Sequence, residues 1–140
     1  MGYKIIVLWV LSASLVQFIK FILTYIKERR IDLSRLIEPG GMPSSHSAAA
    51  STLSTSIGLA CGFNSAVFAV TLFFGCVIVY ESTGLRRAVG EQAEALNKLI
   101  LMVYEKKSLY KEELRIILGH TPVEVLLGIL MGICFALAFF

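Results

Sequence analysis

The most apolar stretch of the chain, residues 123–140, reads VEVLLGILMGICFALAFF and contains one charged side chain, that of Glu124. Three other stretches are similarly long and weakly polar, residues 3–26, 45–61 and 65–80. A bilayer core about 30 Å thick needs roughly 20 apolar residues in a helix. The sequence therefore predicts an all-α integral membrane protein, a helical bundle with about four transmembrane helices.

The composition supports this prediction and excludes several other classes of protein. The chain has 140 residues, which we interpret as a single membrane-embedded domain, residues 1–140. Hydrophobic residues make up 56% of it and charged residues only 16%, against about a quarter in soluble domains. The net charge of +3 gives no electrostatic case for binding nucleic acid. Three cysteines in apolar stretches predict neither a disulfide framework nor a zinc site.

Positive charge is concentrated in two segments, residues 27–44 and 81–120, which hold eleven of the thirteen Lys and Arg residues. With four spans, both segments fall on one side of the membrane, and the two termini and the turn at residues 62–64 fall on the other. The excess of Lys and Arg predicts that the charged side is cytoplasmic in a multi-pass cell-membrane protein. Apolar residues at helical spacing from Leu85 to Val103 predict an amphipathic helix on the membrane surface or against the bundle. A second short helix is expected at residues 111–118.

The chain has two histidines, His46 and His120, and each stands at the start of a predicted membrane helix. They are 74 residues apart in the sequence. Both helices begin on the charged side, so the topology alone makes the two side chains candidates for one site.

The residues before His46 fit a site for an anion. Residues 40–45 read GGMPSS, a flexible loop with hydroxyl donors directly before a helix N-terminus. Helix N-termini bind phosphate because their backbone N–H groups and the positive end of the helix dipole point at the ligand. Ser44 and Ser45 are equally well explained as helix caps, and the two roles are compatible.

Glu124 has two interpretations that the sequence leaves open. Thr121, Pro122 and Glu124 fit a capping box with proline at the first helical position. Glu124 also follows His120 by four residues, the spacing at which a carboxylate reaches an imidazole on a helix. An imidazole held in one tautomer by a carboxylate is a usable nucleophile or base.

Basic side chains at three further positions are candidate phosphate ligands. Lys20, one turn after Gln17, interrupts a membrane helix. It either extends to the interface or faces the loop before His46. Arg86 and Arg87 follow the third span and form either a solvated helix face or a phosphate clamp.

Small residues predict close contact between the second and fourth spans. Gly128 and Gly132 form a small-xxx-small pair, and residues 47–56 are Ala, Ser and Thr apart from Leu53. Such surfaces allow helix backbones to approach inside a bilayer. We expect this contact to hold His46 near His120.

At this point the motifs resemble those of a known family. Residues 43–46, Pro-Ser-Ser-His, are similar to the Pro-Ser-Gly-His motif of the type 2 phosphatidic acid phosphatase superfamily. Residues 120–128 are similar to its His-x-x-x-Asp-Val-x-x-Gly motif, with glutamate in place of aspartate. The wider stretches 40–48, 84–93 and 118–125 resemble a small divergent branch, the acid phosphatase and vanadium-dependent haloperoxidase-related membrane proteins.

The resemblance implies a lipid phosphatase that needs no metal or cofactor. By it, His120 is the nucleophile that forms a phosphohistidine, Glu124 fixes its tautomer, and His46 protonates the leaving alkoxide. The resemblance further implies that Lys20, Ser44, Ser45 and Arg86 or Arg87 stabilise the phosphate oxygens. Electrostatic stabilisation of this kind usually dominates phosphoryl transfer. The implied substrate is a phosphomonoester or pyrophosphate of a membrane lipid.

The chain also departs from the superfamily pattern. Ser45 stands in place of glycine, Glu124 in place of aspartate, and Lys27 and Glu28 in place of an Arg-Pro pair. One alternative function is therefore a non-catalytic anionic-lipid binding or carrier membrane protein. A second alternative, a purely structural membrane protein, predicts that the two histidines lie far apart. Four spans leave a small wall around the site, which a homodimer would complete.

Overall fold

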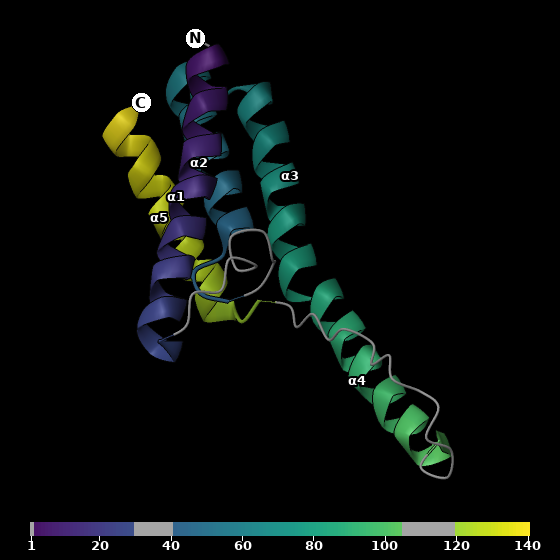
Figure 1. Cartoon of the computed structure of the whole chain (residues 1–140). Coiled ribbons are helices and arrows are strands. Elements are labelled where there is room, and N and C mark those ends of the chain that lie inside the picture. The colour runs from purple at the N-terminus through teal and green to yellow at the C-terminus, as the bar shows by residue number, and fades with distance from the viewer. Residues whose placement is uncertain (1, 30–40, 105–119) are drawn as a thin grey trace.

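The computed structural model of the protein describes residues 2–29, 41–104 and 120–140. These described residues contain no strand, and they form five α-helices (Figure 1): α1 (Gly2–Glu28), α2 (Ser45–Cys61), α3 (Ala66–Thr83), α4 (Leu85–Tyr104) and α5 (Pro122–Phe139).

Three stretches of the described residues are long and apolar enough to cross a membrane. They are Gly2–Lys27, the run Ala66–Ile100 that begins with α3, and Pro122–Phe139. Large apolar side chains on their outer surfaces, such as Phe18, Phe73 and Leu130, are largely exposed. A soluble protein would bury such surfaces, whereas a bilayer solvates them. The prediction of an all-α membrane bundle is confirmed.

Helix α2 lies at the centre of the bundle and contacts α1, α3 and α5. It has 17 residues, and its buried positions carry only Ser, Ala, Thr and Gly. The hydroxyl of buried Thr52 lies 3.0 Å from the carbonyl oxygen of Gly132 in α5 and 2.8 Å from the hydroxyl of Ser12 in α1. Small side chains, and hydroxyls such as that of Thr52 that bond inside the bundle, thus allow α2 to be enclosed by three apolar helices.

The contact between α2 and α5 has the predicted glycine basis. A Cβ atom built on Gly128 would lie closer than 3.0 Å to the carbonyl oxygen of Ser44, and one on Gly132 equally close to that of Ala48. Both obstacles are backbone atoms, which cannot turn aside as a side chain can. The predicted role of the two glycines is confirmed.

The two ends of the bundle are arranged as the four-span topology predicts. The N-terminus, the C-terminus and the turn between α2 and α3 lie at one end (Figure 1), where the Lys4 ammonium donates to the Phe140 carbonyl. The starts of α2 and α5 and the end of α3 lie at the other, which we call the histidine end. Gly62 ends α2 with a φ of 89°, a conformation that favours glycine. Which side of the membrane each end faces stays a prediction.

Helix α4 confirms one expectation and corrects another. Its amphipathic sequence is helical as predicted, but α4 continues beyond α3 and extends away from the bundle (Figure 1). Gly84 has right-handed helical dihedral angles, φ −93° and ψ −72°, so the chain does not reverse between the two helices. In the described part of the chain α4 contacts α3 alone, so of its two expected positions the one against the bundle is wrong. The position on the membrane surface stays a prediction. The short helix expected at residues 111–118 lies outside the described residues.

Candidate active site

The two histidines meet at the histidine end of the bundle. His46 is the second residue of α2, and His120 precedes Thr121, the residue that caps the N-terminus of α5. The centroids of their imidazole rings are 6.4 Å apart, with an angle of 56° between the ring planes. The prediction of a purely structural protein with distant histidines is wrong on this point.

Two backbone hydrogen bonds hold the histidines in place. The Ser44 N–H donates to the Glu124 carbonyl at 3.0 Å, which joins the start of α2 to the first turn of α5. The His120 N–H donates to the Ser82 carbonyl at 3.0 Å, which joins the segment before α5 to the last turn of α3. Sequence reasoning missed Ser82, because a backbone acceptor leaves no trace in residue type.

Glu124 fulfils both roles that the sequence left open. Its Oε2 atom accepts a hydrogen bond from the Thr121 N–H at 3.1 Å, and the Glu124 N–H reaches the Thr121 hydroxyl at 3.4 Å, which completes the capping box. The same Oε2 lies 3.0 Å from Nδ1 of His120. The His120 side chain is only 2% exposed, so this contact is shielded from solvent.

The contact between Glu124 and His120 determines which ring nitrogen is available for chemistry. An ionised carboxylate can only accept hydrogen bonds, so Nδ1 of His120 carries the proton. Nε2, which is buried, is then the nitrogen with the lone pair. His120 is thereby oriented as a nucleophile or a base.

Ser44 is a helix cap, as one of the two interpretations proposed. Its hydroxyl oxygen accepts from the Ser47 N–H at 3.3 Å and lies 3.0 Å from the Ser47 hydroxyl, and all these atoms are buried. Ser45 is half-buried in the first turn of α2. The sequence analysis did not identify Ser47 as the partner of Ser44. Its position three residues after a capping serine is the signal that indicates this contact. Phosphate binding by Ser44 and Ser45 stays a prediction.

Lys20 is buried inside the bundle, with 3% of its surface exposed. Its ammonium lies 3.2 Å from the side-chain oxygen of Gln17. A Cβ built on Gly41 would lie 3.6 Å from Cδ of Lys20, so the lysine stem runs beside the loop that precedes α2. This position favours the interpretation in which Lys20 faces the loop over the one in which it extends outward.

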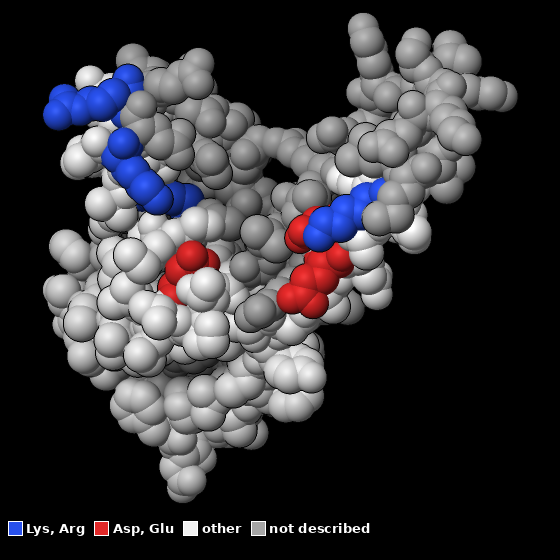
Figure 2. Space-filling model, turned by 90° about the horizontal axis from the view of Figure 1, so that it is seen from below, with Lys and Arg blue, Asp and Glu red and all other residues white. Residues whose placement is uncertain are grey.

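The other charged side chains at this end have mixed signs. In Figure 2, which looks at the molecule from below, the described Lys and Arg side chains form separate groups with acidic side chains between and beside them. Arg86 and Arg87 lie in the first turn of α4, but their side chains are outside the part that the structure describes. Among the described residues, no three His, Cys, Asp or Glu side chains come together as a metal site requires.

The sequence pattern of two histidines at helix starts, with a glutamate four residues after the second, thus corresponds to three side chains that lie together in the structure. The sequence profile of the Divergent PAP2 family matches residues 1–135. The chain belongs to this family. It is also similar to the uncharacterized membrane protein YuiD of Bacillus subtilis (strain 168), with 41% identity over 132 residues. That match covers 86% of this chain and 84% of YuiD. No solved structure matches the chain at a significant level.

Proposed function

We propose that this member of the Divergent PAP2 family is a metal-independent lipid phosphate phosphatase. Its substrate is a phosphomonoester or pyrophosphate of a membrane lipid, and its intermediate is a phosphohistidine. The observation that supports this proposal most directly is the pair of imidazoles 6.4 Å apart, one of them oriented by a carboxylate at 3.0 Å. Two histidines at this distance can act on opposite sides of one phosphoryl group.

The chemistry proceeds in two steps. Nε2 of His120 attacks the terminal phosphorus, the bond from phosphorus to the leaving oxygen breaks, and His46 donates a proton to that oxygen. The leaving group is an alkoxide for a phosphomonoester and a lipid phosphate for a pyrophosphate. Water then attacks the phosphohistidine while His46, now neutral, accepts its proton, and inorganic phosphate and free His120 are released. A positioned acid or base of this kind typically contributes a factor of about 10²–10⁴.

Negative charge on the phosphoryl oxygens needs donors around the two histidines. The N-termini of α2 and α5 converge here and present the positive ends of two helix dipoles. We assign further stabilisation to Lys20, to Ser44 and Ser45, and to Arg86 or Arg87. Interactions of this electrostatic kind usually supply the largest part of phosphoryl-transfer catalysis.

The location of the site explains why such a catalyst is so apolar. A site at the end of a membrane bundle reaches a lipid headgroup while the hydrocarbon chains stay in the bilayer. By the positive-inside rule we place this end on the cytoplasmic side.

The test is phosphate release by the purified protein in lipid nanodiscs. Phosphatidic acid, phosphatidylglycerophosphate and isoprenoid phosphates and diphosphates form the substrate panel, and vanadate is the inhibitor. We expect release from at least one of them, inhibition by vanadate, and a loss of about 10³-fold or more in His120→Ala. His46→Ala should slow release, whereas Lys98→Ala, a control on exposed α4, should match the wild type.

Two outcomes would contradict the proposal. Release that persists in His120→Ala would exclude His120 as the nucleophile. Binding of lipid phosphates without release by the wild type would identify the protein as a non-catalytic binder or carrier of anionic lipids.

A further inference from the structure

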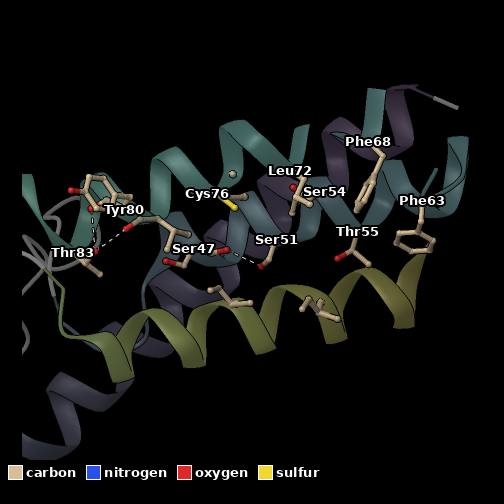
Figure 3. Close-up of a pocket in the computed structure, with 15 residues that line it drawn as sticks. Ser47, Ser51, Ser54, Thr55, Phe63, Phe68, Leu72, Cys76, Tyr80 and Thr83 are labelled. Carbon is tan, nitrogen blue, oxygen red and sulfur yellow. Dashed lines mark hydrogen bonds between the residues drawn. The ribbon is translucent and has the colours of Figure 1, made fainter. Parts of the chain in front are cut away.

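A groove with a volume of about 510 Å³ runs along the bundle between α2, α3 and α5. Figure 3 shows Ser47, Ser51 and Thr55 along its α2 wall, Leu72, Cys76 and Tyr80 on α3, and two residues of α5 on the facing side. Its volume lies in the range of about 300–1,000 Å³ typical of small-molecule pockets.

The wall of the groove suits a hydrocarbon better than a polar ligand. Most of the lining surface is apolar, although α2 contributes several hydroxyl groups. The Ser51 hydroxyl donates back to the Ser47 carbonyl at 2.8 Å, and the Ser54 hydroxyl lies 3.4 Å from the Thr71 carbonyl. These hydroxyls are thus satisfied by backbone acceptors, and a polar group placed between them would lose its hydration without equal compensation.

One end of the groove is lined by residues that neighbour the site, although neither histidine lines it. Ser47, which lines it, is the residue after His46 and bonds the capping hydroxyl of Ser44. On the opposite wall, Thr83 lines the groove and follows Ser82, whose carbonyl holds the His120 backbone. A chain in the groove would therefore end where a headgroup meets the two imidazoles.

The groove is long enough for a hydrocarbon chain that crosses one leaflet of a bilayer. Its α3 wall runs from Phe68 to Thr83, over which an α-helix rises about 22 Å. Half of a hydrocarbon core about 30 Å thick is about 15 Å. Phe63 and Phe68, whose ring centroids are 5.2 Å apart, line the end of the groove far from the histidines (Figure 3).

We propose that this groove holds a hydrocarbon chain of the lipid whose phosphate lies between His46 and His120. The inference rests on the proposed function for the position of the phosphate. It adds that the protein recognises its substrate by chain and headgroup together. An ordinary bilayer lipid and a helix of a second copy of this chain are the competing occupants.

Cys76 provides a direct probe of occupancy. It is exposed and lines the groove, whereas Cys61 and Cys134 are exposed but do not line it. A Cys61→Ser, Cys134→Ser variant in nanodiscs is alkylated with N-ethylmaleimide in the presence of dodecyl phosphate or dodecanol. We expect dodecyl phosphate to slow alkylation of Cys76 several-fold and dodecanol to have much less effect. The matched control keeps Cys134 alone, through Cys61→Ser and Cys76→Ser, and neither ligand should protect it.

A second variant tests the groove through substrate preference. Cys76→Phe places a large ring in the groove, whereas Val77→Phe places the same ring one position along α3, at a residue that is 45% exposed and not part of the lining. We expect Cys76→Phe to lower the ratio of kcat/KM for dodecyl phosphate to that for ethyl phosphate about tenfold. Val77→Phe should leave this ratio unchanged.

The outcomes separate this inference from the proposed function, because alkylation needs no turnover. Protection of Cys76 by dodecyl phosphate in a protein that hydrolyses nothing would support the groove and contradict the phosphatase. His120-dependent hydrolysis with no protection and an unchanged ratio in Cys76→Phe would support the phosphatase and overturn the groove. Equal protection by dodecanol would overturn the coupling of chain and phosphate, and cross-linking of Cys76 between two copies would assign the groove to a dimer.

Discussion

Helix α2 has two neighbours that it meets in opposite ways. Against α5 there is no spare room, since a Cβ on Gly128 or Gly132 would lie closer than 3.0 Å to backbone oxygens of α2. Against α3 the helices leave a groove of about 510 Å³, and a Cβ on Gly75 would lie 3.2 Å from the hydroxyl of Ser54, a side-chain atom.

The two interfaces of α2 therefore have different roles in this small bundle. The tight interface with α5 fixes the register of the two helix starts that carry His46 and His120, and hence the geometry of the site. The loose interface with α3 leaves the space that we assign to a hydrocarbon chain. Substitutions at the two interfaces should therefore differ in kind and in size.

The largest effect is expected from Gly128→Leu, at the tight interface. Its side chain would meet the Ser44 carbonyl, so α5 must move away from α2 and carry His120 with it. Overpacking of this kind costs about 3 kcal/mol or more, and a displacement of about 1 Å at a catalytic group costs about 100-fold in rate. Thermal unfolding in detergent and phosphate release measure the two losses. A Tm equal to that of the wild type would contradict the tight packing.

A smaller loss of stability, but a selective loss of activity, is expected at the start of α5. Glu124→Ala removes the cap and the contact with His120, whereas Thr121→Val removes only the capping hydroxyl. Each should lower the free energy of unfolding by about 0.5–2 kcal/mol. Only Glu124→Ala should also lower kcat, by about 100-fold or more. Similar kcat values for the two variants would reduce Glu124 to a cap.

Thr52→Val should have a moderate effect at the tight interface and none specific to the site. It removes the buried hydrogen bonds from α2 to Gly132 and to Ser12. Hydrogen bonds between membrane helices contribute on average about 0.6 kcal/mol and at most about 1.7. Chemical denaturation in detergent should show a loss of this size, with kcat changed less than about twofold. A loss of activity as large as that in Glu124→Ala would show that Thr52 acts on the site.

The smallest effect is expected from Gly75→Ala, at the loose interface. The new methyl group has only the Ser54 hydroxyl to displace, and alanine favours a helix over glycine by about 1 kcal/mol. The free energy of unfolding should therefore stay within about 1 kcal/mol of the wild type. Gly132→Ala, the matched change at the tight interface, should destabilise clearly, and equal Tm values for the two alanine variants would remove the distinction between the interfaces.

Much of the fold follows from local signals in the sequence. Residues 45–61 were expected as one helix, and α2 has those bounds because Ser44 caps its start and Gly62 ends it. The amphipathic pattern of α4 predicts a helix correctly, but it does not predict the direction in which α4 leaves α3. That direction depends on the backbone dihedral angles of Gly84, which glycine leaves open.

The candidate site was predictable in its residues but not in its connections. Thr121, Pro122 and Glu124 predict a capping box, and the spacing of Glu124 from His120 predicts a contact between them. Both predictions are confirmed, and one atom, Oε2 of Glu124, accepts from the Thr121 N–H and contacts His120. Spacing alone does not show that a single oxygen makes both contacts. The backbone bond from His120 to Ser82 had no signal in the sequence, because every residue has a carbonyl group.

By itself, the sequence determined that this protein is a bundle of apolar helices and that each histidine stands at the start of one. The length of an apolar stretch and the capping of a helix depend on a single segment, so they can be predicted without knowledge of the helices that pack against it. Only the tertiary structure decided that the two imidazoles lie 6.4 Å apart and that a groove leads away from them. Both depend on the register at which Gly128 and Gly132 meet the backbone of α2, a contact between residues about 80 positions apart whose geometry is set by packing.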